Sequence, residues 1–114
     1  MGSYMFKVTY SQQGLKGIIS EGAEHRVAFI GKLMDSLGGS LESFHFAFGE
    51  TDAYVIGEVP DDKTAAAVAM ATAAAVAMAV GASGAGSSVT VKLLKPADVD
   101  AARAISTGYQ PPGA

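Results

Sequence analysis

The sequence predicts an α+β domain with one four-stranded antiparallel sheet and two main helices on one of its faces. Three observations lead to this prediction. Aromatic and β-branched residues are concentrated near both ends of the chain, at Tyr4–Tyr10 and Val89–Leu94. Two further strand-like runs, Ser40–Phe48 and Ala53–Val59, are separated by a short polar turn. Segments with helical spacing or helical propensity fill the two long intervals between these strands.

The first strand, Tyr4–Tyr10, carries bulky side chains on both faces and contains no Gly or Pro. After it, Gln12–Ile19 is expected to form only a short helical turn, because Gly14 and Gly17 weaken it. The main helix of this half is predicted over Ala23–Leu37, where apolar residues recur every three or four positions. The glycine pair that follows Leu37 favours a left-handed helix end.

The middle of the chain is predicted to form a hairpin around the four-residue turn Gly49–Asp52. This loop length pairs Phe48 with Ala53 and sets which residues share a face. Asp52 is expected to bond the backbone of its own turn, as an aspartate in a hairpin usually does. After the second strand, Pro60 cannot donate to a sheet, and the acidic pair Asp61-Asp62 is expected to cap the next helix.

That helix is predicted over Thr64–Val80, an alanine-rich stretch in which the seven residues 65–71 recur at 73–79. Its length falls below the roughly 20 apolar residues of a membrane span, so we expect no membrane insertion. Gly81–Ser88 is read as a flexible connector, because its glycine spacing matches no phosphate or dinucleotide fingerprint. A short last helix is expected from Pro96 to about Ile105.

The resulting order, βαββαβ plus a short C-terminal helix, is the ferredoxin-like arrangement with sheet order 4-1-3-2. In this arrangement both main helices cover one face of the sheet. The strands are too apolar for the other face to stay in water, because aromatic and aliphatic residues occupy both sides of their alternation. We therefore expect two copies to pack sheet against sheet as a homodimer, which gives a dimeric α/β barrel.

The segment F-G-E-T-D-A-Y-V-I-G-E-V-P-D-D, followed by an alanine-rich helix, resembles the GYD domain family. The resemblance extends over about residues 4–105. It implies a dimeric α/β barrel, a group of folds that includes cofactor-free monooxygenases, isomerases, cyclases and effector-binding modules. Thr51 stands where the family has a tyrosine. The other positions that match are Gln13-Gly14, Arg26, Leu37-Gly38-Gly39, Gly49, Asp52, Glu58 and Pro60-Asp61-Asp62.

Composition narrows the classes of function. The 114 residues suit a single domain, taken as 1–106, with a flexible tail at 107–114. A net charge of −3 and eight scattered basic residues argue against a nucleic-acid partner. The absence of cysteine excludes a disulfide framework and fits a reducing cytoplasm, and the N-terminus has no secretory pattern. His25 and His45 lack ligand spacing, so we predict no metal and no cofactor.

The candidate site follows from the predicted register. His45 shares a face with Tyr54 and Glu58, and extending the alternation adds residues of the first and last strands. Histidine exchanges protons near neutral pH, so His45 is the candidate catalytic acid or base. Lysines could stabilise a developing oxyanion on a small acidic or carbonyl compound. The predicted ligand-binding residues are Lys7, Thr9, Tyr54, Glu58 and Lys92, with Ser43 and Thr90 on the same face.

Three functional hypotheses stay open on the sequence alone. The first is a small-ligand-binding or cofactor-independent enzyme that uses the barrel lumen. The second is a non-catalytic effector-binding or stress-related module on the same scaffold. For the charged residues of the lumen a structural alternative also stays open, in which Lys7, Glu58 and Lys92 pair across the dimer. The third is a structural protein whose alanine-rich helix assembles into higher oligomers. A wide polar cavity around His45 and Lys7 would favour the first two.

Overall fold

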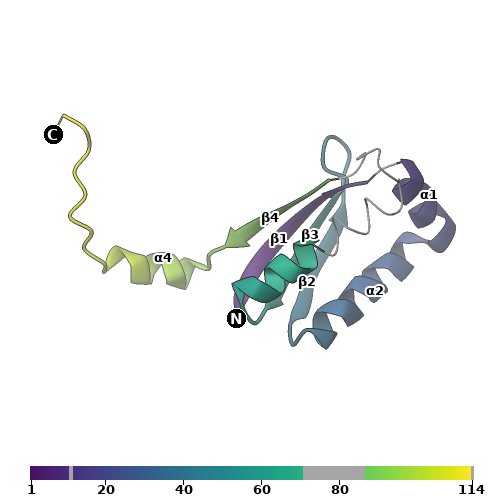
Figure 1. Ribbon diagram of the computed structural model, residues 1–114, viewed down its shortest axis with the longest axis horizontal. Coiled ribbons are helices and arrows are strands. Elements are labelled where there is room, and N and C mark those ends of the chain that lie inside the picture. Colours follow the sequence, from purple (N-terminus) through teal and green to yellow (C-terminus); the bar gives the residue numbers. More distant parts are fainter. Residues whose placement is uncertain (11, 71–86, 114) are drawn as a thin grey trace.

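The computed structural model describes residues 1–10, 12–70 and 87–113 of the chain. Its four strands form one antiparallel sheet in the order β2-β3-β1-β4, which confirms the predicted strand order (Figure 1). The first strand lies inside the sheet, between β3 and β4, so strands from the two halves of the chain alternate across the sheet. The strands are β1 (Gly2–Thr9), β2 (Ser40–Phe46), β3 (Ala53–Val59) and β4 (Ser87–Leu93).

The helices are α1 (Gln12–Glu21), α2 (Ala23–Ser36) and α4 (Pro96–Arg103), and residues 62–70 are also helical. The prediction of only a short turn before α2 is wrong, because α1 is a full helix that contacts α2. Packing against a neighbour can override the weak propensity of its glycines. The helix predicted over Thr64–Val80 is confirmed as far as residue 70. Its second alanine-rich copy and residues 81–86 of the predicted connector lie outside the described residues.

The core lies between the sheet and the helices on one face only. Tyr4 and Phe6 of β1 and Val55 and Val59 of β3 are buried against Met34 of α2. Ala65 and Val68, from the helical residues 62–70, complete this cluster. All the strand members of the core alternate onto the same side of the sheet, as the period-two pattern requires. We call the opposite side, which carries Met5, Lys7, Tyr54, Ile56, Val89 and Val91, the open face.

The end of α2 is fixed to the end of β3 by two glycines. Gly38 adopts a left-handed φ of 80°, and the Gly39 amide donates to the Met34 carbonyl at 3.0 Å, which together form a Schellman-type helix end. A Cβ on Gly39 would lie 1.9 Å from the carbonyl oxygen of Glu58. No other residue fits at this position, so the glycine pair sets the height of α2 on the sheet.

The hairpin between β2 and β3 has a longer loop than predicted. Phe46, not Phe48, pairs with Ala53, so the loop comprises residues 47–52, and Phe48 lies in it fully exposed. The pairing is therefore shifted by two residues from the predicted one. Because side chains alternate with period two, a two-residue shift leaves the residues from Ser43 to Phe46 on their expected faces. The ladder also carries an irregularity between Leu41 and Ser43.

Candidate functional site

The register of the sheet brings three predicted site residues into one row on the open face. His45 of β2 lies opposite Tyr54 of β3, and Tyr54 lies opposite Lys7 of β1. Directly opposed residues in antiparallel strands have Cβ atoms about 5 Å apart, so neighbouring side chains can act on one small molecule. His45 is exposed, and Tyr54 and Lys7 are partly exposed. None of the three side chains makes a hydrogen bond or an ion pair with a described residue.

An apolar row follows next to this polar row. Ile56 of β3 lies opposite Met5 of β1, which lies opposite Val91 of β4. Val91 is 36% exposed. Val89, which lies opposite Lys7 on the edge strand β4, is 54% exposed. An apolar row that stays partly exposed on a sheet face is a candidate surface for a partner or a ligand.

Glu58 lies at the far end of the open face from the polar row. It is four residues from Tyr54 along β3, or about 13 Å at the rise of a strand. Its Oε1 atom accepts a hydrogen bond from Lys95 Nζ at 2.8 Å, and this bond lowers the pKa of the Glu58 carboxyl. Its neighbour across the ladder is Ser3, which is buried. The structure therefore does not bring Glu58 together with His45, and its carboxylate is engaged by the lysine just before α4.

The placement predicted for Lys92 and Thr90 is wrong. Lys92 pairs with Tyr4, and Thr90 pairs with Phe6, so both alternate onto the face that carries the helices. The open face of β4 instead carries Val89, Val91 and Leu93. The prediction extended an alternation across the long interval before β4, and no local feature of the sequence fixes the parity of that strand.

Thr9 and Asp52 brace the hairpin loop at the polar end of the sheet. The Thr9 hydroxyl donates to the backbone carbonyl of Glu50 at 2.7 Å. The Asp52 carboxylate accepts a hydrogen bond from the backbone amide of Tyr10 at 2.8 Å, and the Asp52 amide donates to the Val8 carbonyl at 2.9 Å. The prediction that Asp52 bonds its own turn is wrong, because its side chain instead accepts from the residue that follows β1, which still gives it a structural role. These bonds hold the loop beside the polar row.

A further polar group at this end was not recognised as a site in the sequence. Tyr10 is partly buried, and burial raises the pKa of its hydroxyl, while the nearby Arg26 guanidinium acts in the opposite direction. The same guanidinium lies 5.1 Å from the centroid of the Phe29 ring. The Arg26 guanidinium therefore interacts with both Tyr10 and Phe29, and we assign Arg26 a structural role.

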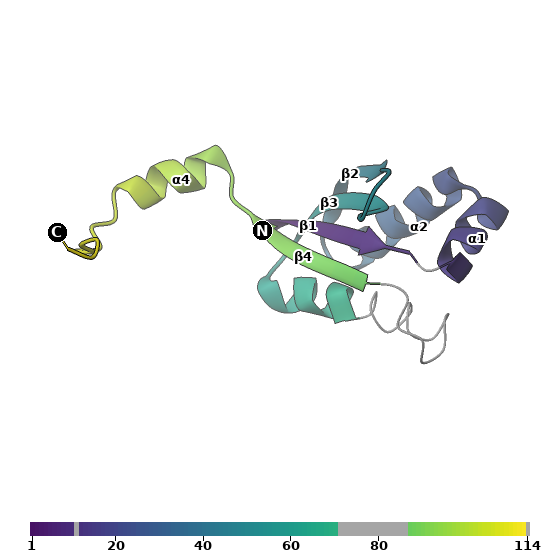
Figure 2. The same cartoon turned by 90° about the horizontal axis from the view of Figure 1, so that it is seen from above.

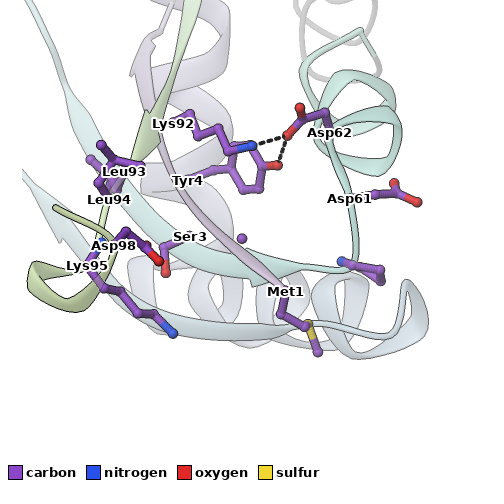
Figure 3. Close-up of a pocket in the computed structure, with 12 residues that line it drawn as sticks. Met1, Ser3, Tyr4, Asp61, Asp62, Lys92, Leu93, Leu94, Lys95 and Asp98 are labelled. Carbon is purple, nitrogen blue, oxygen red and sulfur yellow. Dashed lines mark hydrogen bonds and ion pairs between the residues drawn. The ribbon is translucent and has the colours of Figure 1, made fainter. Parts of the chain in front are cut away.

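The described residues also line a cleft of about 570 Å³ where the start of β1, the residues after β3 and the end of β4 meet (Figure 3). Asp62 Oδ1 accepts hydrogen bonds from the Tyr4 hydroxyl and from Lys92 Nζ, the latter at 2.8 Å. The cleft lies at the opposite end of the sheet from His45. Its lining comprises Met1, Gly2, Ser3, Tyr4, Pro60, Asp61, Asp62, Lys92, Leu93, Leu94, Lys95 and Asp98.

The polar groups of this cleft satisfy one another. The hydrogen bond to Asp62 raises the pKa of the Tyr4 hydroxyl, and the hydrogen bond from Lys92 lowers the pKa of Asp62. Each shift favours the protonation state that the trio already has at neutral pH. Asp61 accepts from the Thr64 amide at 2.8 Å, which confirms its predicted role as a helix cap. We therefore read the trio as a clamp that joins the start of the helical residues 62–70 to the edge of the sheet.

Two absences are specific to the described parts of the chain. Within residues 1–10, 12–70 and 87–113, no group of three or more His, Cys, Asp or Glu side chains could hold a metal ion. No helix in those same ranges is long and apolar enough to cross a membrane.

Comparison with known proteins gives one match. The family model described as the GYD domain matches residues 4–102 of the chain. No curated protein and no solved structure matches it. The matched region contains the sheet except for Gly2 and Ser3 of β1, and α4 except for Arg103, so it includes every residue of the polar row.

Proposed function

The chain belongs to the GYD domain family, and from this premise we propose that two copies pair through their open faces and enclose a site for a small acidic or carbonyl compound. The row of His45, Tyr54 and Lys7 carries this proposal. These three polar side chains stand side by side with no partner among the described residues, next to apolar residues that a second copy would cover. Desolvation by that second copy would strengthen each polar contact to the ligand.

The chemistry of the row suits an acidic or carbonyl group. The Lys7 ammonium supplies a positive charge and up to three hydrogen bonds to an oxyanion. The Tyr54 hydroxyl between the two other side chains can donate to the same oxygen, and the His45 imidazole can accept or release a proton. The activity that fits best is cofactor-independent acid–base chemistry on such a compound, in the cytoplasm that a cysteine-free chain suits.

A ligand panel tests the binding half of the proposal. Small carboxylates and carbonyl compounds, each paired with the alcohol of the same carbon skeleton, are added to the protein while thermal unfolding is followed. A binder at 100 times its Kd stabilises the folded state by about 2.7 kcal/mol, which is a measurable rise in Tm. We expect carboxylates or carbonyls to give this rise and the matched alcohols not to. A panel that leaves the Tm unchanged would count against the site.

Variants connect any binding to the polar row. Lys7→Gln and Tyr54→Phe should abolish the rise in Tm, while Lys32→Gln, at an exposed position on α2, should leave it unchanged. If the rise survives both changes in the row, the ligand binds elsewhere and the proposal fails. The enzyme and the non-catalytic binding module are separated by His45→Ala: loss of turnover with binding retained supports an enzyme, and binding without turnover in the unaltered protein supports the module.

A further inference from the structure

The last part of the described chain is fully exposed although it contains a folded helix. Every residue from 94 to 113 is exposed, and α4 contacts none of the strands and neither α1 nor α2. Figures 1 and 2 show this segment, which we call the C-terminal arm, leading away from the sheet in both views. The radius of gyration is 17.2 Å, against about 13 Å for a compact chain of this length.

The arm leaves the domain in a fixed direction. Lys95, just before α4, is joined through its Nζ atom to Glu58 Oε1 on β3. The Lys95 amide donates to the Asp98 carboxylate at 3.0 Å, which caps the first turn of α4. The ion pair with Glu58 joins the root of α4 to the end of β3, and the bond to Asp98 lies within the arm. The arm therefore lies over neither face of its own domain (Figure 2).

A helix in this position needs something to pack on. Isolated helices shorter than about 12 residues are marginally stable in water even with good sequences, and α4 has 8 residues. Its large apolar side chains are also in solvent: Val99 is 49% exposed, and Ile105 and Tyr109, just beyond the helix, are 69% and 76% exposed. These three side chains lie along a segment that contacts no described strand and neither α1 nor α2, so a partner that covers the arm would remove their apolar surface from water.

A second copy of the chain is the partner that the geometry favours. On β4 the open face carries Val89, Val91 and Leu93, and the next residue, Leu94, is 66% exposed at the root of the arm. A copy that covers the open face thus lies next to the arm root. A two-fold dimer applies the same contact twice, so each arm would lie on the other copy. An interface of standard size uses about 20–30 residues on each side, and the arm offers residues 94–113.

We propose that the C-terminal arm is exchanged between two copies, with Val99, Ile105 and Tyr109 as its anchoring side chains. This inference rests on the proposed pairing through the open face, and it adds a second region of contact outside the barrel. In this arrangement the arm holds the two copies together from outside the barrel. The lumen therefore stays available to a ligand.

The test compares the dimer dissociation constant of arm variants by sedimentation equilibrium. One variant ends at Lys95 and keeps the ion pair with Glu58; the other carries Val99→Asp and Ile105→Asp. Both should raise the dissociation constant at least tenfold. The control is Ile19→Asp on α1, where the side chain is 83% exposed, and it should change the constant less than twofold. An unchanged constant in both arm variants would overturn the arm exchange.

Amide hydrogen exchange gives a second readout that does not depend on the variants folding. In the unaltered protein, amides of α4 should be protected above the dissociation constant and lose protection on dilution below it. Protection that is absent at high concentration, or that persists in the monomer, refutes the exchange. A dimer that depends on Val91 but not on the arm refutes this inference alone, whereas a protein that is monomeric at all concentrations refutes both this inference and the proposed pairing.

Discussion

Replacing Val89 and Val91 together by threonine should break the proposed dimer while leaving the fold of each copy intact. Threonine keeps the branched shape that suits a strand and exchanges one methyl group for a hydroxyl. Both valines have exposed surface on the open face, so a single copy should lose less than about 0.5 kcal/mol of stability. The effect on association should be far larger, because the same surface is buried when a second copy covers it.

The magnitude follows from the number of altered groups at the interface. A buried methyl group contributes about 0.8 kcal/mol, and a hydroxyl buried in its place adds a desolvation penalty, so each replacement should cost about 1 kcal/mol. Two positions in each of two symmetric copies give about 4 kcal/mol, which is close to a 10³-fold rise in the dissociation constant.

Sedimentation equilibrium over a range of concentrations measures this change directly, and far-UV circular dichroism checks that the secondary structure is retained. The matched control is Thr90→Val, which makes the reverse exchange on the opposite face of the same strand. It should leave the dissociation constant unchanged. A rise smaller than tenfold for the double variant, or an equal effect of Thr90→Val, would show that the open face is not where the copies meet.

Three further predictions concern the stability of the domain. Met34 is 1% exposed in the core, so Met34→Ala should lower the free energy of unfolding by about 3 kcal/mol in urea titrations; a loss below about 1 kcal/mol would contradict the packing of α2 on the sheet. Gly39→Ala places a Cβ 1.9 Å from a backbone oxygen, and we expect a clear fall in Tm, whereas an unchanged Tm would show that α2 does not end there. The hydrogen bond from Lys92 lowers the pKa of Asp62 below its ordinary 3.8, so its stabilisation is complete above that value and is lost as the pH falls through the lower, folded-state pKa. Asp62→Asn should therefore flatten the acid side of the stability profile, and a profile unchanged in slope would remove the Asp62 clamp as its cause.

In the β2–β3 hairpin, the local sequence pattern predicts the strands and their faces but not the length of the loop. The positions of β2 and β3 and the faces of His45, Tyr54 and Phe44 follow from alternation and from the polar turn. The loop length does not, because Ala47 and Phe48 have the composition of a strand and yet lie in the loop. The predicted faces of these residues are still correct only because the pairing is shifted by an even number of residues.

The last strand shows the opposite outcome. Val89 and Val91 alternate with Thr90 and Lys92, a pattern that would usually turn its valines toward the core. In the structure the valines lie on the open face, and Lys92 lies on the helix side because Asp62 and Tyr4 bind it there. The sequence separations in this clamp are 30 and 58 residues, so no window of sequence could indicate it.

Periodicity, breakers and caps by themselves determined the order of the elements along the chain and the ends of the main helix. These properties depend on neighbours within a few residues, and short-range sterics and hydrogen bonding decide them. Only the tertiary structure decided which face β4 turns outward, that Glu58 is engaged by Lys95, and that His45, Tyr54 and Lys7 form one row. These depend on the register between strands far apart in the chain, which is fixed by the packing of the whole core rather than by any single segment.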